Sequence, residues 1–285
     1  MAVNYADEHA NAILEAWYPG ARGGEAVARA LFGETNPQGK LPVTFYHSDR
    51  DLPEFTDYAM KGRTYRYMEK EALYPFGYGL SYTTFKQEMG KVSYKNGKIS
   101  FDVTVTNTGD KAGKDVVEVY YNPPYTDGGI EKASKNLVAF EKTKKLEPGA
   151  SQTVKIEFDD DDMASYDQKD AKAYVLEQGD YDISIQSDSH HVIDHQKVTV
   201  KDTVTYNSDS NTHNGDAVAA TNEFDYAAGD VTYLSRAGHF ANYAKATAAP
   251  TNFSMSDEAK AEFTNNSNYL SLIHISEPTR HAQIS

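Results

Sequence analysis

The sequence predicts the end of a larger α/β domain followed by an all-β immunoglobulin-like sandwich. Up to residue 70, a helical pattern lies between two short apolar runs. From residue 89 onward, apolar and polar residues alternate with a period of two. Between these parts lies the segment Leu73–Phe85, in which five of thirteen residues are aromatic and two are glycine. These three observations define two structural classes in one chain.

We call residues 73–85 the aromatic clasp. Pro75 and the two glycines exclude a regular helix, and the aromatic content excludes a solvated linker. Gly77 and Gly79 allow turns where a Cβ would clash, while the rings offer rigid area to bury. We therefore expect the aromatic clasp to pack against both neighbouring parts.

The first part predicts one β-α-β unit. Residues 1–14 are expected to be helical and to lead into a buried strand over Ile13–Tyr18. A helix is expected over Glu25–Phe32, with Gly33 at its C-terminal cap, and a second strand over Leu41–Tyr46. One such unit cannot cover both faces of a parallel sheet, so we expect the beginning of this domain to be absent.

The second part predicts antiparallel strands joined by turns. Asn96-Gly97 is a hairpin signal between two of them. Strands are expected at residues 91–95, 99–105, 116–121, 137–142, 151–158, 171–176, 179–186 and 192–200. About seven short strands over roughly a hundred residues are typical of an immunoglobulin-like sandwich.

The composition excludes several classes of partner. The 285 residues suffice for about two domains. The 42 acidic residues against 28 basic ones give a net charge of −14, so we expect no nucleic acid and no membrane as partners. Without cysteine, disulfides and thiolate sites are impossible. Nothing after Met1 resembles a secretion signal, which favours the cytoplasm over secretion.

Several motifs resemble one family in the right order. They are the segments Ala12–Gly24, Gly39–Phe45, Gly62–Tyr67 and Pro75–Phe85. Together they resemble glycoside hydrolase family 3, the β-glucosidase and β-xylosidase family. Leu146-Glu-Pro-Gly-Ala and Glu177-Gln-Gly-Asp-Tyr resemble landmarks of the fibronectin type III-like domain found in many of its members.

The resemblance implies an organisation for the whole chain. Residues 1–86 would be an α/β fragment, the C-terminal part of an α/β sandwich domain, and residues 87–201 the fibronectin type III-like sandwich. Residues 202–269, rich in small polar residues, would be a connector towards a missing barrel domain of the same polypeptide. Within the connector, Ser256 with the acidic residues after it predicts the start of a short helix.

The resemblance also implies an activity. The whole enzyme would be a retaining exo-β-glycosidase acting on non-reducing-end β-linked glucose or xylose, with a carbohydrate substrate and no cofactor. Its nucleophilic Asp and its acid/base Glu map to no position here, so we assign no catalytic residue and expect this chain alone to be inactive. Glu15 and Glu25 lie in matched motifs, but exposed or capping roles are favoured. The alternative is a non-catalytic carbohydrate-binding or surface interaction module, which the α/β part argues against.

The best substrate-binding candidates lie in one motif. Arg63, Tyr65, Arg66 and Tyr67 offer guanidinium forks and aromatic faces that suit sugar hydroxyls and rings. A structural role is favoured, in which this segment is locked onto the aromatic clasp by stacking and cation-π contacts.

No metal site is expected. The run Asp159–Asp162 lacks the spacing of a calcium loop and more often caps the turn that follows. His190, His191 and His195 could chelate a transition metal, but a polar turn before the last strand is favoured.

We expect the last residues to have a different origin. Leu270–Arg280 resembles the translated read-through of a sequencing adapter, and Ile284-Ser285 fits the constant bases after a variable index. A natural polar tail is the alternative. We expect residues 270–285 to be a sequencing artefact and the gene to continue beyond Tyr269.

Overall fold

The computed structural model describes residues 2–227, 231–249, 251 and 254–265. The proposed adapter segment, residues 270–285, lies outside them. The described chain forms two compact units, one made of residues up to 220 together with 235–241, and one made of 221–234 together with residues from 242 onward. Each unit is described by itself.

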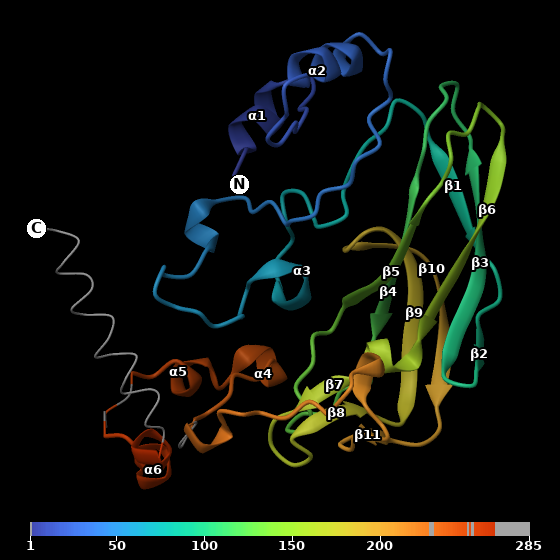
Figure 1. Cartoon of the computed structure of the whole chain (residues 1–285). Helices are drawn as coiled ribbons and strands as arrows, with labels where there is room; N and C mark the ends of the chain where they lie inside the picture. Colours follow the sequence, from blue (N-terminus) through green and yellow to red (C-terminus); the bar gives the residue numbers. More distant parts are fainter. Residues whose placement is uncertain (1, 228–230, 250, 252–253, 266–285) are drawn as a thin grey trace, which may run out of the picture. The chain divides into compact units, whose positions relative to one another are not determined.

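The beginning of the first unit is a mixed α/β region. Its helices are α1 (Asn4–His9), α2 (Gly23–Leu31), the 3-10 turn η1 (Asp49–Asp51) and α3 (Thr64–Tyr67) (Figure 1). The predicted helix and its cap are confirmed by α2 and by Gly33, which has φ +74° and donates its N–H to the Ala30 carbonyl at 3.0 Å. The expected helix over residues 1–14 is reduced to α1.

The two strands predicted in this region are wrong. Ile13–Tyr18 is irregular, and its large apolar side chains are exposed, with Tyr18 fully so. Leu41–Tyr46 contributes a single antiparallel bridge, between Phe45 and Tyr74, so no parallel β-α-β unit forms among the described residues. A strand requires partners for its N–H and C=O groups along its length. Within Leu41–Tyr46, Leu41 and Phe45 bond to the aromatic clasp, which is too little for a strand, and no backbone–backbone hydrogen bond is found for Ile13–Tyr18 within the part of the chain that the structure describes.

The second part of the first unit consists of antiparallel sheets. One sheet contains β1 (Phe85–Met89), β2 (Ser93–Lys95), β3 (Lys98–Asn107) and β6 (Ser151–Asp159). A second has the order β10 (His191–Val200), β9 (Gly179–Asp188), β4 (Val116–Asn122), β5 (Asn136–Lys142). A third has the order β11 (Val204–Tyr206), β8 (Ala173–Leu176), β7 (Ser165–Asp167). All eight predicted strands are present, whereas β1, β7 and β11 are additional.

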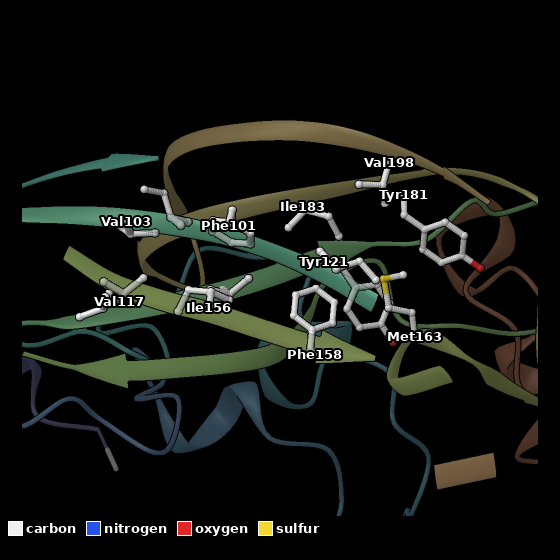
Figure 2. Close-up of a cluster of buried hydrophobic side chains, with 14 of the residues drawn as sticks. Phe101, Val103, Val117, Tyr121, Ile156, Phe158, Met163, Tyr181, Ile183 and Val198 are labelled. Carbon is white, nitrogen blue, oxygen red and sulfur yellow. The ribbon is translucent and has the colours of Figure 1, made fainter. Parts of the chain in front are cut away.

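The core lies between the strands and follows from their period. In β3, residues 99, 101, 103 and 105 are buried, while those between them are exposed or half-buried. Figure 2 shows Phe101 and Val103 of β3 gathered with Ile156 of β6 and Ile183 of β9. Tyr206 of β11 belongs to the same core. Inward-facing residues of the two larger sheets thus make the sandwich predicted for this part.

Local turn chemistry also follows the sequence. Asn96 and Gly97 have φ of 52° and 76°, the left-handed pair of a tight hairpin between β2 and β3. Asp159 and Asp162 form a reciprocal cap on the turn Asp160–Met163, which confirms the capping role predicted for this acidic run.

The remaining elements are short. The turn η3 (His213–Gly215) and α4 (Ala237–Phe240) belong to the first unit, whereas η4 (Asp225–Ala227), α5 (Tyr243–Ala246) and α6 (Asp257–Asn265) belong to the second. The helix predicted after Ser256 is confirmed by α6, whose Ala259 N–H donates to Ser256 Oγ at 3.1 Å. Among the described helices, none has the length and apolar character needed to cross a bilayer.

Candidate functional site

The aromatic clasp holds the mixed α/β region together. The N–H groups of Leu41 and Phe45 donate to the carbonyls of Tyr78 and Tyr74, each at 2.8 Å. The rings of Tyr74 and Tyr78 stack at 5.1 Å. On its other side the clasp meets the sandwich, because the Ser189 N–H, directly after β9, donates to the Phe76 carbonyl at 2.8 Å. The predicted packing against both neighbours is therefore present.

A buried carboxyl group lies where the clasp meets β4. Glu118 is 4% exposed, and Tyr120 donates its hydroxyl to Glu118 Oε2 at 2.7 Å. A Cβ on Gly77, whose φ is +85°, would come within 2.1 Å of the same oxygen, so only glycine fits against this carboxyl. Burial raises the pKa of Glu118 to about 7, with the Tyr120 hydrogen bond and the Lys40 charge opposing that shift.

The four predicted site residues lie around α3 but point to different surroundings. Arg63 donates to two backbone carbonyls, from Nε to Ala59 at 2.9 Å and from Nη2 to Asp57. Tyr65 stacks on Phe76 of the clasp at 4.6 Å, with an interplanar angle of 24°. Its hydroxyl also accepts the N–H of Leu137 at 3.1 Å. Tyr65 makes the stacking contact that the structural hypothesis predicts.

Arg66 and Tyr67 instead line a cavity. Arg66 Nη2 donates to Asn136 Oδ1 at 2.6 Å, and its guanidinium lies 5.9 Å from the centre of the Tyr67 ring. The cavity has a volume of about 280 Å³, is open to solvent, and is lined by the end of α3, the loop after β4 and α4. Two of the four predicted residues thus share a recess. A substrate role for all four stays a prediction.

The opposite wall of the cavity was missed by sequence reasoning. Arg236 lies over the ring of Tyr125 at 3.6 Å and donates from Nε to the Lys132 carbonyl at 2.6 Å. Tyr125 in turn donates its hydroxyl to Glu131 Oε2 at 3.1 Å. Arg236 stands in an otherwise polar connector more than a hundred residues from Tyr125, so no local pattern could pair them.

The other candidate groups have structural partners. Glu25 accepts hydrogen bonds from Arg22 and forms an ion pair with Arg29 at 2.9 Å, and Glu15 accepts the Trp17 N–H at 2.8 Å. Glu25 thus has the exposed, helix-side role favoured for it, whereas Glu15 is half-buried and caps a backbone N–H within an irregular segment.

The histidines meet carboxylates rather than one another. His191 Nδ1 lies 2.9 Å from Asp188 Oδ1, and His195 Nδ1 lies 2.8 Å from Asp182 Oδ1. The Asp182 hydrogen bond raises the pKa of His195, whereas burial lowers that of His190. No three His, Asp or Glu side chains within the described ranges are grouped so that they could hold a metal ion.

Comparison with known families places two domains on this chain. Residues 1–82 match the glycosyl hydrolase family 3 C-terminal domain, and residues 115–189 match a fibronectin type III-like domain. These two matches lie in the order that the sequence motifs predict.

Known proteins agree with the domain matches. The chain is 43% identical over 170 residues to a xylan 1,4-beta-xylosidase of Xylanibacter ruminicola, covering 59% of this chain and 19% of that protein. It is 37% identical over 200 residues to a beta-glucosidase of Kluyveromyces marxianus, covering 65% and 23% respectively. The solved beta-glucosidase 3B of Thermotoga neapolitana, in complex with alpha-D-glucose, matches with a TM-score of 0.65 and 32% identity, over 72% of this chain and 30% of that one. The chain thus spans about a quarter of the length of its curated relatives.

Proposed function

Because this chain belongs to glycoside hydrolase family 3, with its C-terminal domain followed by a fibronectin type III-like domain, we propose that it is part of a retaining exo-β-glycosidase. The enzyme removes β-linked glucose or xylose from the non-reducing ends of oligosaccharides. The observation that carries this proposal is the presence of both domains, in this order, in a chain whose relatives are beta-glucosidases and beta-xylosidases.

The chemistry needs two carboxyl groups about 5 Å apart, one as nucleophile and one as acid/base. In our proposal both come from other parts of the enzyme, the nucleophile from a barrel domain that follows residues 202–269. Residues 1–86 supply the end of the α/β sandwich domain, and residues 87–201 the fibronectin type III-like domain. Glu15 and Glu25 carry no catalytic role.

A chimera tests this proposal. Residues 1–201 of this chain replace the matching segment of the Kluyveromyces marxianus beta-glucosidase, and hydrolysis of aryl β-glucoside and aryl β-xyloside is measured. We expect a folded chimera that hydrolyses at least one of them, whereas the purified chain by itself gives no turnover. The parent enzyme with the segment deleted is the negative control.

A variant of Glu25 tests whether its carboxyl group takes part in catalysis. Glu25→Gln in the chimera is expected to leave the rate within about twofold, because the ion pairs of Glu25 are exposed. A folded chimera without hydrolysis would overturn the proposed function. Turnover by the purified chain that Glu25→Gln abolishes would place a catalytic carboxylate inside this chain, contrary to the proposal.

A further inference from the structure

The cavity beside α3 combines ring surfaces with hydrogen-bonding groups of both kinds. Tyr67 packs edge-on against Phe240 with ring centres 6.4 Å apart, and both residues line the cavity, which gives it one apolar wall. The guanidinium groups of Arg66 and Arg236 also line the cavity. Within the described chain, each of these groups makes one hydrogen bond to protein out of five N–H donors. Both therefore keep donors for a ligand.

Acceptors lie in the same recess. Asp127, which is exposed, and Glu69 contribute carboxylates to the lining. Glu69 Oε1 lies 2.7 Å from His239 Nδ1, which fixes one of its oxygens. A ligand hydroxyl that donates to Asp127 can accept from an arginine at the same time. Such paired donors and acceptors next to an apolar wall match a polyhydroxylated ring.

The charges in the cavity are balanced. Two arginines face two carboxylates, in a chain whose net charge is −14. An anionic ligand would meet the carboxylates of Asp127 and Glu69 as well as the guanidinium groups, so it would gain little electrostatic binding energy. The lining therefore favours a neutral ligand over a charged one.

The size of the cavity limits the ligand. About 280 Å³ is near the lower end of small-molecule sites, which suits one sugar ring rather than a longer segment. The backbone on the α4 side of the cavity is strained, since His239 and Phe240 have φ of 58° and 61°. Strain of this kind in non-glycine residues is concentrated at ligand sites.

We propose that this cavity binds one ring of a neutral β-linked oligosaccharide, with Tyr67, supported from behind by the buried Phe240, against the apolar face of the ring. Arg66, Arg236 and Asp127 hydrogen-bond its hydroxyls. The class of ligand rests on the proposed glycosidase function, whereas the site rests on the geometry of this chain alone. The cavity makes the α3 segment, together with α4 of the connector, a saccharide-binding element.

Binding to the full chain tests the site directly. The probes are cellobiose and xylobiose, with glucuronic acid as the charged comparison, measured by saturation-transfer NMR and calorimetric titration. We expect saturable binding of at least one disaccharide with Kd on the order of millimolar, and weaker binding of glucuronic acid. Tyr67→Ala and Asp127→Ala should each raise Kd about tenfold, as expected when one ring contact or one charge-assisted hydrogen bond is lost.

Matched variants keep the result interpretable. Tyr58→Ala removes a tyrosine that is 85% exposed, and Asp202→Ala removes an exposed aspartate, both outside the cavity lining. Both should leave Kd unchanged, and Tyr67→Phe should retain binding because it keeps the ring. Thermal melting checks that each variant is folded.

Three results would overturn the inference: no saturable binding by the unaltered chain, equal losses in the control variants, or tighter binding of glucuronic acid. The chimera separates this inference from the proposed function. If the chimera hydrolyses glycosides and the chain binds no disaccharide, only the cavity proposal fails. If binding depends on Tyr67 and Asp127 while a folded chimera is inert, only the proposed function fails.

Discussion

The mixed α/β region and the β-sandwich use their apolar residues in opposite ways. In the sandwich, apolar side chains from three sheets are nearly all shielded, as Ile99, Val119 and Ile183 show with no exposed area. Before residue 85, the buried apolar side chains of the described chain are those of Phe45 and Ala72, while Phe55 is 92% exposed. The sandwich therefore encloses its own core, and the mixed α/β region does not.

Contacts with the sandwich supply part of what this region lacks. Asn36 Nδ2 donates to the Ala112 carbonyl at 3.1 Å, and Lys142 Nζ donates to that of Gln38 at 2.8 Å. Together with the clasp and Tyr65, these bonds tie one region to the other. The difference teaches that hydrogen-bonded strands can stabilise themselves, whereas a region with few buried side chains takes its order from a neighbour.

Separating the two regions should have the largest effect. A chain of residues 84–207 retains every strand and should melt cooperatively, while residues 1–86 should show no cooperative transition because their apolar surface stays uncovered. Circular dichroism melting with sedimentation analysis checks both. A monomeric, cooperative transition of residues 1–86 would contradict the comparison.

Two leucine variants, one in the sandwich and one in the mixed α/β region, test the difference in burial between these regions. Leu176→Ala removes a side chain that is 1% exposed in the sandwich core and should lower the free energy of unfolding by about 2 to 5 kcal/mol. Leu31→Ala, where the side chain is 66% exposed, should change it by less than about 0.5 kcal/mol. Urea unfolding of the full chain measures both. Equal losses would show that Leu31 is covered in solution.

The buried carboxyl between the regions should make stability depend on pH. Burial raises the pKa of Glu118 from 4.5 to about 7, so between these values the folded state keeps a proton that the unfolded state loses. The free energy of unfolding should therefore fall as pH rises through this window, by about 2 to 3 kcal/mol, and be independent of Glu118 below it.

Glu118→Gln should remove that dependence. The variant should match the unaltered chain at pH 4.5 and be more stable at pH 8, because the amide carries no charge and its oxygen can accept from Tyr120. Urea unfolding at the two pH values measures the difference, with the exposed Glu141→Gln as control. If the free energy of unfolding falls with pH equally steeply in both variants, the pH dependence comes from groups other than Glu118.

Two glycines with positive φ provide the smallest contrast. Gly33→Ala should destabilise by about 1 kcal/mol through backbone strain alone, since nothing lies within 4 Å of the added Cβ. Gly77→Ala should lose about 2 kcal/mol, because its Cβ meets Glu118 as well. Thermal unfolding of the two variants measures both losses of stability. A smaller loss at Gly77 would show that the clasp moves away from β4 at little cost.

The accuracy of the sequence predictions follows the same division. The strands β2 to β6 and β8 to β10 were predictable where inward and outward residues alternate, as in β3, because each strand finds its partner within the chain. The short strands β7 and β11 carry too few residues to show a period. The strand expected over Ile13–Tyr18 failed because apolar sequence alone provides no hydrogen-bonding partner.

The candidate site was predictable only in part. Arg66 and Tyr67 were found from one motif, because residue type and local spacing are visible in sequence. Tyr125 and Arg236 were not, since their contact depends on how a loop of the sandwich and the later connector meet in space.

The hydrogen bond between Phe76 and Ser189 also has a consequence during synthesis. The clasp leaves the ribosome more than a hundred residues before Ser189, the residue after β9 that donates the hydrogen bond to Phe76. At a translation rate of about 5 to 20 residues per second, the aromatic rings wait roughly 5 to 20 s for that partner. Over that interval the aromatic clasp of the nascent chain lacks the hydrogen bond that ties it to the sandwich.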